Sequence, residues 1–236
     1  IYFSLKKVVA TFQGRCEGFF RGGREPAGFR NEATLQICQQ YKGRARFATL
    51  YNSNLRLPVY SAYLLHPHGM SAREDSWLIE PQARLGKSQA LEEDYKGDPY
   101  DRGHLNPVAH QAGTNREATF TLTNVAPMHR TLNRGSWRVC EEQLRDLSSS
   151  LCPPGVPVYV LTGTSPPFLG KIPVTSPGRV EYKWVCGISS EEGRENYTEP
   201  YLLQLKTVED LFSNNCAVLS DCDLHAPSYV LRASRT

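Results

Sequence analysis

The sequence lacks the features of a membrane protein and of the common zinc proteins. No apolar run approaches the roughly 20 residues that a membrane-spanning helix needs. Neither a CxxC pair nor an HExxH segment is present, so zinc ribbons and a zinc-dependent hydrolase have no ligand set. Internal repeats and low-complexity tracts are also missing, which excludes solenoids and disordered chains.

The chain carries little net charge and few signs of a helical bundle. Its 27 Lys and Arg residues exceed its 24 Asp and Glu residues by only three, so affinity for nucleic acid would require a local basic surface. The 18 glycines and 16 prolines indicate many turns. A chain of 236 residues can bury its own core, and we expect a single domain over residues 1–236.

Seven cysteines are many for a cytosolic protein and predict disulfides. The sequon that begins at Asn196 offers a glycosylation acceptor, and both features favour a secreted, extracellular protein. The first residues, IYFSLKKVVATF, contain lysines and no signal-peptide core, which indicates a mature chain without its leader. We expect the pairing Cys16–Cys38, a free Cys140 on a buried helix face, and, with other pairings open, Cys186–Cys216 and Cys152–Cys222.

Alternating apolar and β-branched residues predict a mainly antiparallel sheet with few helices, which is an α+β fold. Residues 46–65 contain two apolar runs separated by NSN and predict a hairpin. Further strands are expected at 77–81, 119–127, 156–163 and 180–189, and a strand followed by a short helix at 201–212.

One helix is predicted after residue 132. Its apolar stripe has spacings of three and four residues and comprises Trp137, Cys140, Leu144, Leu147 and Leu151.

Asn133 falls near this inward stripe, where an amide must find partners for its donors and its acceptor. An N-cap would satisfy part of that demand, and coordination of a metal through the carbonyl oxygen would satisfy the rest. Glu141 and Arg145 are spaced to pair on one flank of the helix.

The segment DRGH, residues 101–104, places an acid, a guanidinium and an imidazole around one glycine. It has two interpretations. In the first, it is a polar turn in which Asp101 pairs with Arg102 and Gly103 supplies a positive φ. In the second, His104 is a general base, because a neutral imidazole accepts a proton near pH 7.

Four ordered pieces decide between them: DRGH, TFTLTNVAPM (119–128), LNRGSW (132–137), and Glu141 with Arg145. Together they resemble the DNA/RNA non-specific endonuclease family with the ββα-metal fold. The chain also resembles the vertebrate endonuclease-domain-containing branch of that family, through FATLYNSNLRLPVYSAY, Cys38 in LQICQQ, and the later LTGT and SNNC. The resemblance covers about residues 16–216.

The resemblance implies a role for each motif residue. His104 would be the general base, and Asn133 the single protein ligand of a divalent ion, expected to be Mg²⁺ with Mn²⁺ or Ca²⁺ as substitutes. Glu141 would hold water around the ion. Arg145 and Arg102 would offer guanidinium forks to the phosphate or brace carboxylates.

Asn124 matches the family asparagine beside the active site, and its expected role is positioning. Some relatives contribute an arginine from before DRGH; it has no assignable counterpart in this sequence, and Arg73 and Arg84 both stay open. Five further arginines could form a basic rim: Arg44, Arg46, Arg130, Arg134 and Arg138. The remaining histidines are expected to be non-catalytic: His66, His68, His110, His129 and His225.

The sequence thus predicts a secreted metal-dependent nuclease that acts on DNA, with RNA as an open alternative, and whose partner is nucleic acid and no membrane. The assigned contacts go to phosphate or metal, so no base would be read. The rival hypothesis is a nuclease fold without turnover that serves as a nucleic-acid-binding or immune-interaction module. Oligomeric state, strand preference and biological role stay open. The nuclease hypothesis depends on His104 and Asn133 facing one another.

Overall fold

The computed structural model describes residues 8–26, 28–66, 77–79, 85, 88–96, 100–151, 155, 157–165, 183–190, 216–218 and 229–231. The strands are β1 (Val8–Val9), β2 (Thr34–Tyr41), β3 (Arg44–Asn52), β4 (Leu57–Leu64), β5 (Tyr100–His104), β6 (Val125–His129), β7 (Val158–Ser165), β8 (Lys183–Ser190), β9 (Cys216–Val218) and β10 (Tyr229–Leu231). The α-helices are α1 (Thr114–Ala118), α2 (Arg130–Leu132) and α3 (Arg138–Leu151). Short 3-10 turns are η1 (Glu17–Phe19), η2 (Arg21–Gly23), η4 (Glu92–Tyr95), η5 (Val108–His110) and η6 (Leu122–Asn124), and η7 (Asn133–Trp137) is a π-helical turn.

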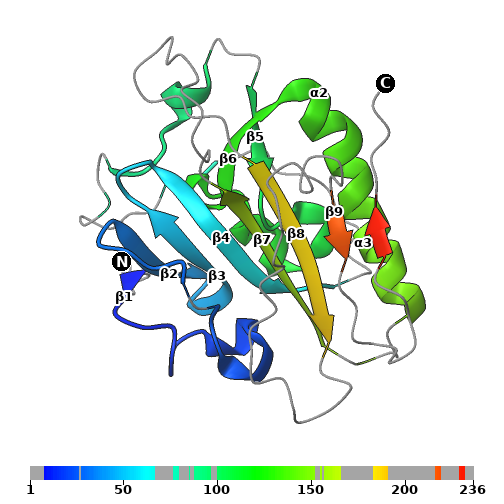
Figure 1. The fold of residues 1–236 in the computed structure, drawn as a ribbon. Coiled ribbons are helices and arrows are strands. Elements are labelled where there is room, and N and C mark those ends of the chain that lie inside the picture. The colour runs from blue at the N-terminus through cyan, green and yellow to red at the C-terminus, as the bar shows by residue number, and fades with distance from the viewer. Residues whose placement is uncertain are drawn as a thin grey trace.

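Within these residues, six strands form one antiparallel sheet in the order β1-β2-β3-β4-β7-β8, and β5 pairs with β6 in a separate two-stranded antiparallel sheet (Figure 1). The predicted hairpin at 46–65 is confirmed as β3 and β4. The NSN segment forms its turn because the Asn52 side-chain oxygen accepts hydrogen bonds from the backbone N–H groups of Asn54 and Leu55. The α+β class and the predominance of antiparallel strands are also confirmed.

Both faces of the sheet are covered. On one face, buried residues of β3, β4 and β7 pack with Met128 of β6 and with Trp137, Cys140 and Leu144 of the helix. These three helix residues confirm the predicted stripe. On the other face, the N-terminal segment packs Phe12 and other apolar residues onto the sheet. The β5–β6 pair therefore lies in the layer of the helix, and Figure 1 shows both beside the sheet.

Two strand predictions were partly wrong. Residues 119–127 were expected to be extended, but η6 occupies Leu122–Asn124 and the strand begins only at Val125. The Asn124 amide donates to backbone carbonyls of Asn106 and Thr119, and these tertiary contacts override the alternating pattern. In the segment 77–81, the described residues form only an isolated bridge, Leu78 with Thr121. The segment 201–212 lies outside the described residues.

The helix that carries Asn133 was expected after residue 132, but it begins earlier, at Arg130. His129 precedes the first turn and its side chain accepts a hydrogen bond from the backbone N–H of Thr131, so His129 is the N-cap. Asn133 lies inside the helix, at the start of the π-helical turn, where Gly135 departs from helical geometry (φ −104°, ψ −113°). The N-cap interpretation of Asn133 is therefore wrong.

One disulfide prediction is confirmed and another is wrong. Cys16 and Cys38 are bonded, and the bridge ties the N-terminal segment to β2. Cys140 was expected to be the free thiol, but it is disulfide-bonded. Burial suggested a free thiol, yet a buried position suits a compact apolar disulfide equally well. The predictions for Cys152, Cys186, Cys216 and Cys222 lie outside the described side chains.

Candidate active site

The DRGH segment is strand β5, so the interpretation as a polar turn is wrong. Gly103 pairs with Ala126 of β6, and a Cβ at this position would lie 2.7 Å from the Met128 Cβ and 3.2 Å from the Ala126 carbonyl oxygen. Real Cβ atoms do not approach backbone and core atoms that closely. The glycine is thus required by the packing of β5 against β6.

Asp101 is the centre of a charged cluster between β5 and the helix. Arg134 donates to both of its carboxylate oxygens, at 2.8 and 3.0 Å, and Arg130 lies 3.5 Å from Oδ1. Asn133 donates to Oδ2 at 3.2 Å. The hydrogen bond from Arg134 is the main cause that lowers the pKa of Asp101; burial opposes it, and Asn133 and the two arginine charges add to it. Asp101 is therefore a carboxylate at neutral pH.

The contact with Asp101 fixes the orientation of the Asn133 amide. Because Nδ2 donates to the carboxylate, Oδ1 points elsewhere, and within the described residues it accepts no hydrogen bond. An amide oxygen is a hard ligand that suits Mg²⁺, which keeps several of its waters. Among the described residues no cluster of three or more His, Cys, Asp or Glu side chains could hold a metal, and a site with one protein ligand does not need one. π-helical turns are also frequent at functional sites.

His104 lies in an aromatic setting at the end of β5. Its ring centroid is 5.1 Å from that of Trp77 and 5.5 Å from that of Phe120, and its Nε2 is buried. Arg102 stacks over Trp77 at 4.6 Å and lies 3.5 Å from the Glu92 carboxylate. Trp77 thus orders both predicted site residues of β5.

The structure does not bring His104 and Asn133 into contact. Side chains alternate along a strand, so Asp101 and His104, three positions apart, lie on opposite faces of β5 and about 10 Å apart along it. Asn133 meets Asp101, whereas His104 meets Trp77. No described hydrogen bond or ring contact joins the two side chains. That His104 and Asn133 serve one site, as base and metal ligand, stays a prediction.

Asn124 is fully buried and uses its whole hydrogen-bonding capacity. Its Oδ1 accepts from Ser61 Oγ (2.9 Å) and from the backbone N–H of Asn106 (3.0 Å). Its Nδ2 donates to the carbonyls of Asn106 and Thr119, both at 3.0 Å. The backbone N–H of the residue after His104 donates to the Asn124 carbonyl at 2.9 Å. Asn124 therefore ties the chain that leaves His104 to the central sheet.

Glu141 lies two turns beyond Asn133 and is half-buried. Burial of its carboxyl group raises its pKa to about 8, which a hydrogen bond from Trp137 partly opposes. The sequence suggested that Arg145 could pair with Glu141, but Arg145 donates to Asp146 instead, at 3.1 Å. Asp146 is exposed and Arg145 is half-buried.

His110 connects helix α3 to strand β4 through both nitrogens of its ring. Its Nε2 lies 2.8 Å from the Glu141 carbonyl and its Nδ1 lies 2.9 Å from the Tyr63 hydroxyl. Because the carbonyl only accepts, Nε2 carries the proton and Nδ1 accepts from Tyr63. Burial lowers the pKa of His110 to about 4, so the ring is neutral. No local sequence pattern predicts this bridge from β4 to α3, because Tyr63, His110 and Glu141 are far apart in the chain.

The predicted basic rim is largely paired in the structure. Arg134 and Arg130 contact Asp101, and Arg138 pairs with Glu142 at 2.6 Å. Arg46 donates to Tyr41 and Asn115, and Arg44 is exposed. Several other predicted positions lie outside the described residues: Arg73, Arg84, His68, His225 and Asn196.

Comparisons with known proteins agree with the motif assignment. The family described as DNA/RNA non-specific endonuclease matches residues 25–211. The human endonuclease domain-containing 1 protein is 37% identical over 175 residues, which are 65% of this chain and 35% of that protein. The bovine mitochondrial endonuclease G is 30% identical over 149 residues, 61% of this chain and 48% of that protein.

The chain thus spans about a third to a half of these relatives. A solved structure of the EndoG/EndoGI complex, described by its mechanism of EndoG inhibition, matches with a TM-score of 0.45 and 20% identity, over 66% of this chain and 62% of that one. None of the described helices is long and apolar enough to cross a membrane. Since the family match covers most of the sequence and includes DRGH and the Asn133 segment, the chain belongs to the DNA/RNA non-specific endonuclease family.

Proposed function

We propose that this protein is a secreted, metal-dependent nuclease that hydrolyses phosphodiester bonds of DNA, and of RNA as a second substrate. The observation that carries the proposal is the Asn133 amide: Asp101 holds its Nδ2, and its Oδ1 is left to bind a divalent cation. The family match supports the nuclease activity, and the motif residues supply the chemical groups that it requires.

Each residue has a defined task in this proposal. Asn133 Oδ1 binds Mg²⁺, which when bound supplies a Lewis acid for the phosphate. His104 takes the proton from the attacking water, and Glu141 accepts hydrogen bonds from water around the ion. Arg102 and Arg145 donate to phosphate oxygens. Asn124 positions the chain that leaves His104.

His104 ends β5 and Asn133 begins η7, so the substrate must reach side chains of both elements for the two residues to act together. Residues that act as one catalytic unit show non-additive losses. His104→Ala, Asn133→Ala and the double variant should therefore lose cleavage to a similar extent while remaining folded. Full activity of His104→Ala would remove the imidazole from the mechanism.

The decisive experiment incubates the purified protein with plasmid DNA and with RNA, in Mg²⁺ and in a chelator. Cleavage in Mg²⁺ that stops in the chelator supports the proposal. Mn²⁺ and Ca²⁺ in parallel identify the ions that substitute.

A second function has its own supporting observation. The His104 ring packs against both Trp77 and Phe120, with a buried Nε2 and no described contact to Asn133, as would suit a nuclease fold that binds without turnover. Such a protein would serve as a nucleic-acid-binding or immune-interaction module. It would bind oligonucleotides and show no cleavage with any of the three metals.

A further inference from the structure

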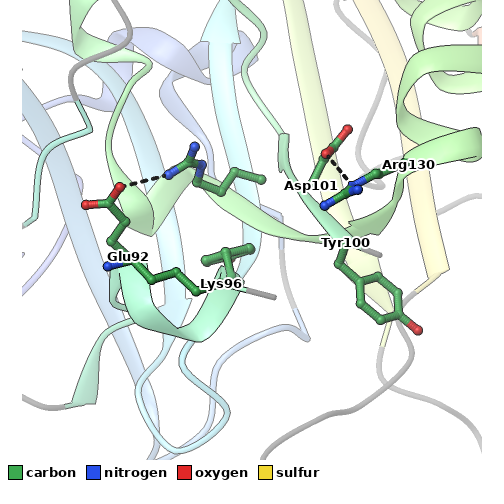
Figure 2. Close-up of a pocket in the computed structure, with 7 residues that line it drawn as sticks. Glu92, Lys96, Tyr100, Asp101 and Arg130 are labelled. Atoms are coloured by element: carbon green, nitrogen blue, oxygen red, sulfur yellow. Dashed lines mark hydrogen bonds and ion pairs between the residues drawn. The ribbon is translucent and has the colours of Figure 1, made fainter. Parts of the chain in front are cut away.

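A polar pocket opens next to the candidate metal ligand, between η4 and β5. Its volume is about 220 Å³, and it is lined by Glu92, Tyr95, Lys96, Tyr100, Asp101, Arg102 and Arg130. Figure 2 shows Glu92 and Lys96 on one side of the pocket, and Tyr100, Asp101 and Arg130 on the other. Glu92 belongs to η4, Tyr100 and Asp101 belong to β5, and Arg130 belongs to α2.

The pocket lining carries more positive than negative charge. Both carboxylates are paired: Glu92 lies 3.5 Å from Arg102, and Asp101 lies 3.5 Å from Arg130 and also accepts from Arg134, which does not line the pocket. Lys96 is exposed at the rim, and among the described residues its ammonium has no ion-pair partner. Three cations against two carboxylates give the pocket a net charge of +1. The lining therefore suits a small anion with several acceptor oxygens.

The same lining disfavours the other parts of a nucleotide. Five of the seven lining residues are charged, whereas a pocket for a base or an apolar ligand is lined mainly by apolar and aromatic side chains. Guanidinium forks and a lysine ammonium are the groups that recognise phosphate oxygens. An arginine on each side can donate to one phosphate while keeping one contact to its carboxylate, because a guanidinium has five donors.

The pocket is continuous with the candidate metal site. Asp101 lines the pocket and also accepts the hydrogen bond from the metal ligand Asn133. Arg102 lines the pocket and contacts Trp77, which packs against His104. A strand whose scissile phosphate lies at Asn133 would thus place a neighbouring phosphate within reach of the pocket.

We infer that this pocket binds a backbone phosphate of the substrate strand beside the one that is cleaved, with Lys96, Arg102 and Arg130 as the donors. This inference rests on the proposed function. Lys96 supplies a charge to ground-state and transition-state complexes alike, so it raises affinity and leaves the chemical step unchanged. Glu92 opposes phosphate entry by its charge and by its contact with Arg102.

The test measures binding of the full chain to a single-stranded DNA oligonucleotide in a chelator, over a series of salt concentrations. The slope of log K against log salt is negative, and each lost phosphate contact makes it shallower by about 0.7. Lys96→Gln should therefore bind about five-fold more weakly at 0.1 M salt. Glu92→Gln should bind more tightly than wild type. In Mg²⁺, Lys96→Gln should raise KM and keep kcat.

Arg15→Gln is the matched control, because Arg15 is exposed, carries the same charge and lies beside Cys16 in the N-terminal segment at the far side of the sheet. Its slope and affinity should equal those of wild type. If Lys96→Gln and Glu92→Gln also equal wild type while the wild type binds and cleaves, the phosphate pocket is wrong and the nuclease proposal stands. If the wild type does neither, the nuclease proposal itself fails.

Discussion

Asn124 and Asn133 lie in neighbouring parts of the molecule and differ in how many hydrogen bonds their amides make. Asn124 is fully buried in η6 and makes four, two as acceptor and two as donor. Asn133 is half-buried in η7 and makes one, from Nδ2 to Asp101. A satisfied amide fixes the backbone around it, whereas an amide anchored at one end keeps its oxygen for a ligand. The difference separates a framework residue, Asn124, from the proposed metal ligand, Asn133.

The largest expected effect is a loss of cleavage when the Asn133 side chain is removed. Asn133→Ala should reduce the rate of Mg²⁺-dependent DNA cleavage by about 10³-fold, because a bound Lewis acid contributes several kcal/mol to the transition state. Its free energy of unfolding should change by less than about 1 kcal/mol, since only one hydrogen bond is lost. Cleavage assays and denaturant unfolding measure the two quantities. Undiminished cleavage would mean that Asn133 is not the metal ligand.

The second effect concerns stability. Asn124→Ala leaves buried partners without their bonds, among them the Ser61 hydroxyl and the backbone of Asn106. Each such group costs about 1 to 3 kcal/mol, so the free energy of unfolding should fall by about 3 kcal/mol or more, and Tm by about 6 to 12 °C.

Ser61→Ala is the control, because it removes one of the four bonds and should cost about 1 kcal/mol. If Asn124→Ala were no less stable than Ser61→Ala, the buried network would not be a framework.

The sequence predicts where the candidate site lies but not the different roles of these two asparagines. The spacing of DRGH, the 119–128 segment and the Asn133 segment located the candidate site, and the alternation at 46–65 located a hairpin of the sheet. The roles of the two asparagines differ because of contacts with residues distant in sequence, such as Ser61 and Asp101, and no local pattern specifies those contacts.

The third effect is a pH dependence of stability in the absence of metal. The folded-state pKa of Glu141 is raised to about 8 by burial, so the folded protein keeps this proton where the unfolded chain has lost it. The stabilisation is present below the unfolded pKa and is lost as pH rises through about 8. His110, whose pKa is lowered, shows the opposite trend, but only below its ordinary value of 6.5.

Between about pH 6.5 and 8, stability in chelator should therefore fall by up to about 1.4 kcal/mol per pH unit. Glu141→Gln should flatten this part of the curve, as measured by urea unfolding at each pH. An unchanged curve in the variant would show that Glu141 is not the titrating group.

The smallest expected effect is a weaker metal affinity when Asp101 no longer holds the Asn133 amide. Asp101→Asn keeps the shape of the side chain but removes the charge that holds Arg134 and the Asn133 amide. Partners that orient a ligand typically contribute 10-fold or more to metal affinity, so Mn²⁺ binding, followed by electron paramagnetic resonance, should weaken about 10-fold.

Glu142→Gln is the control, since Glu142 forms an exposed ion pair with Arg138 on the same helix. It should bind Mn²⁺ as wild type does. Equal affinities of the Asp101 and Glu142 variants would contradict an orienting role for Asp101.

The sequence by itself determined the family, the α+β class, the helix stripe and the Cys16–Cys38 bridge, because these depend on local periodicity and on ordered motifs. Only the tertiary structure decided that Gly103 is required by the approach of β6 and that Cys140 is bonded. It also decided that His104 packs against Trp77 while Asn133 meets Asp101. The physical reason is that spacing along a chain fixes which face of an element a residue occupies, whereas the neighbour on that face is set by how distant elements pack.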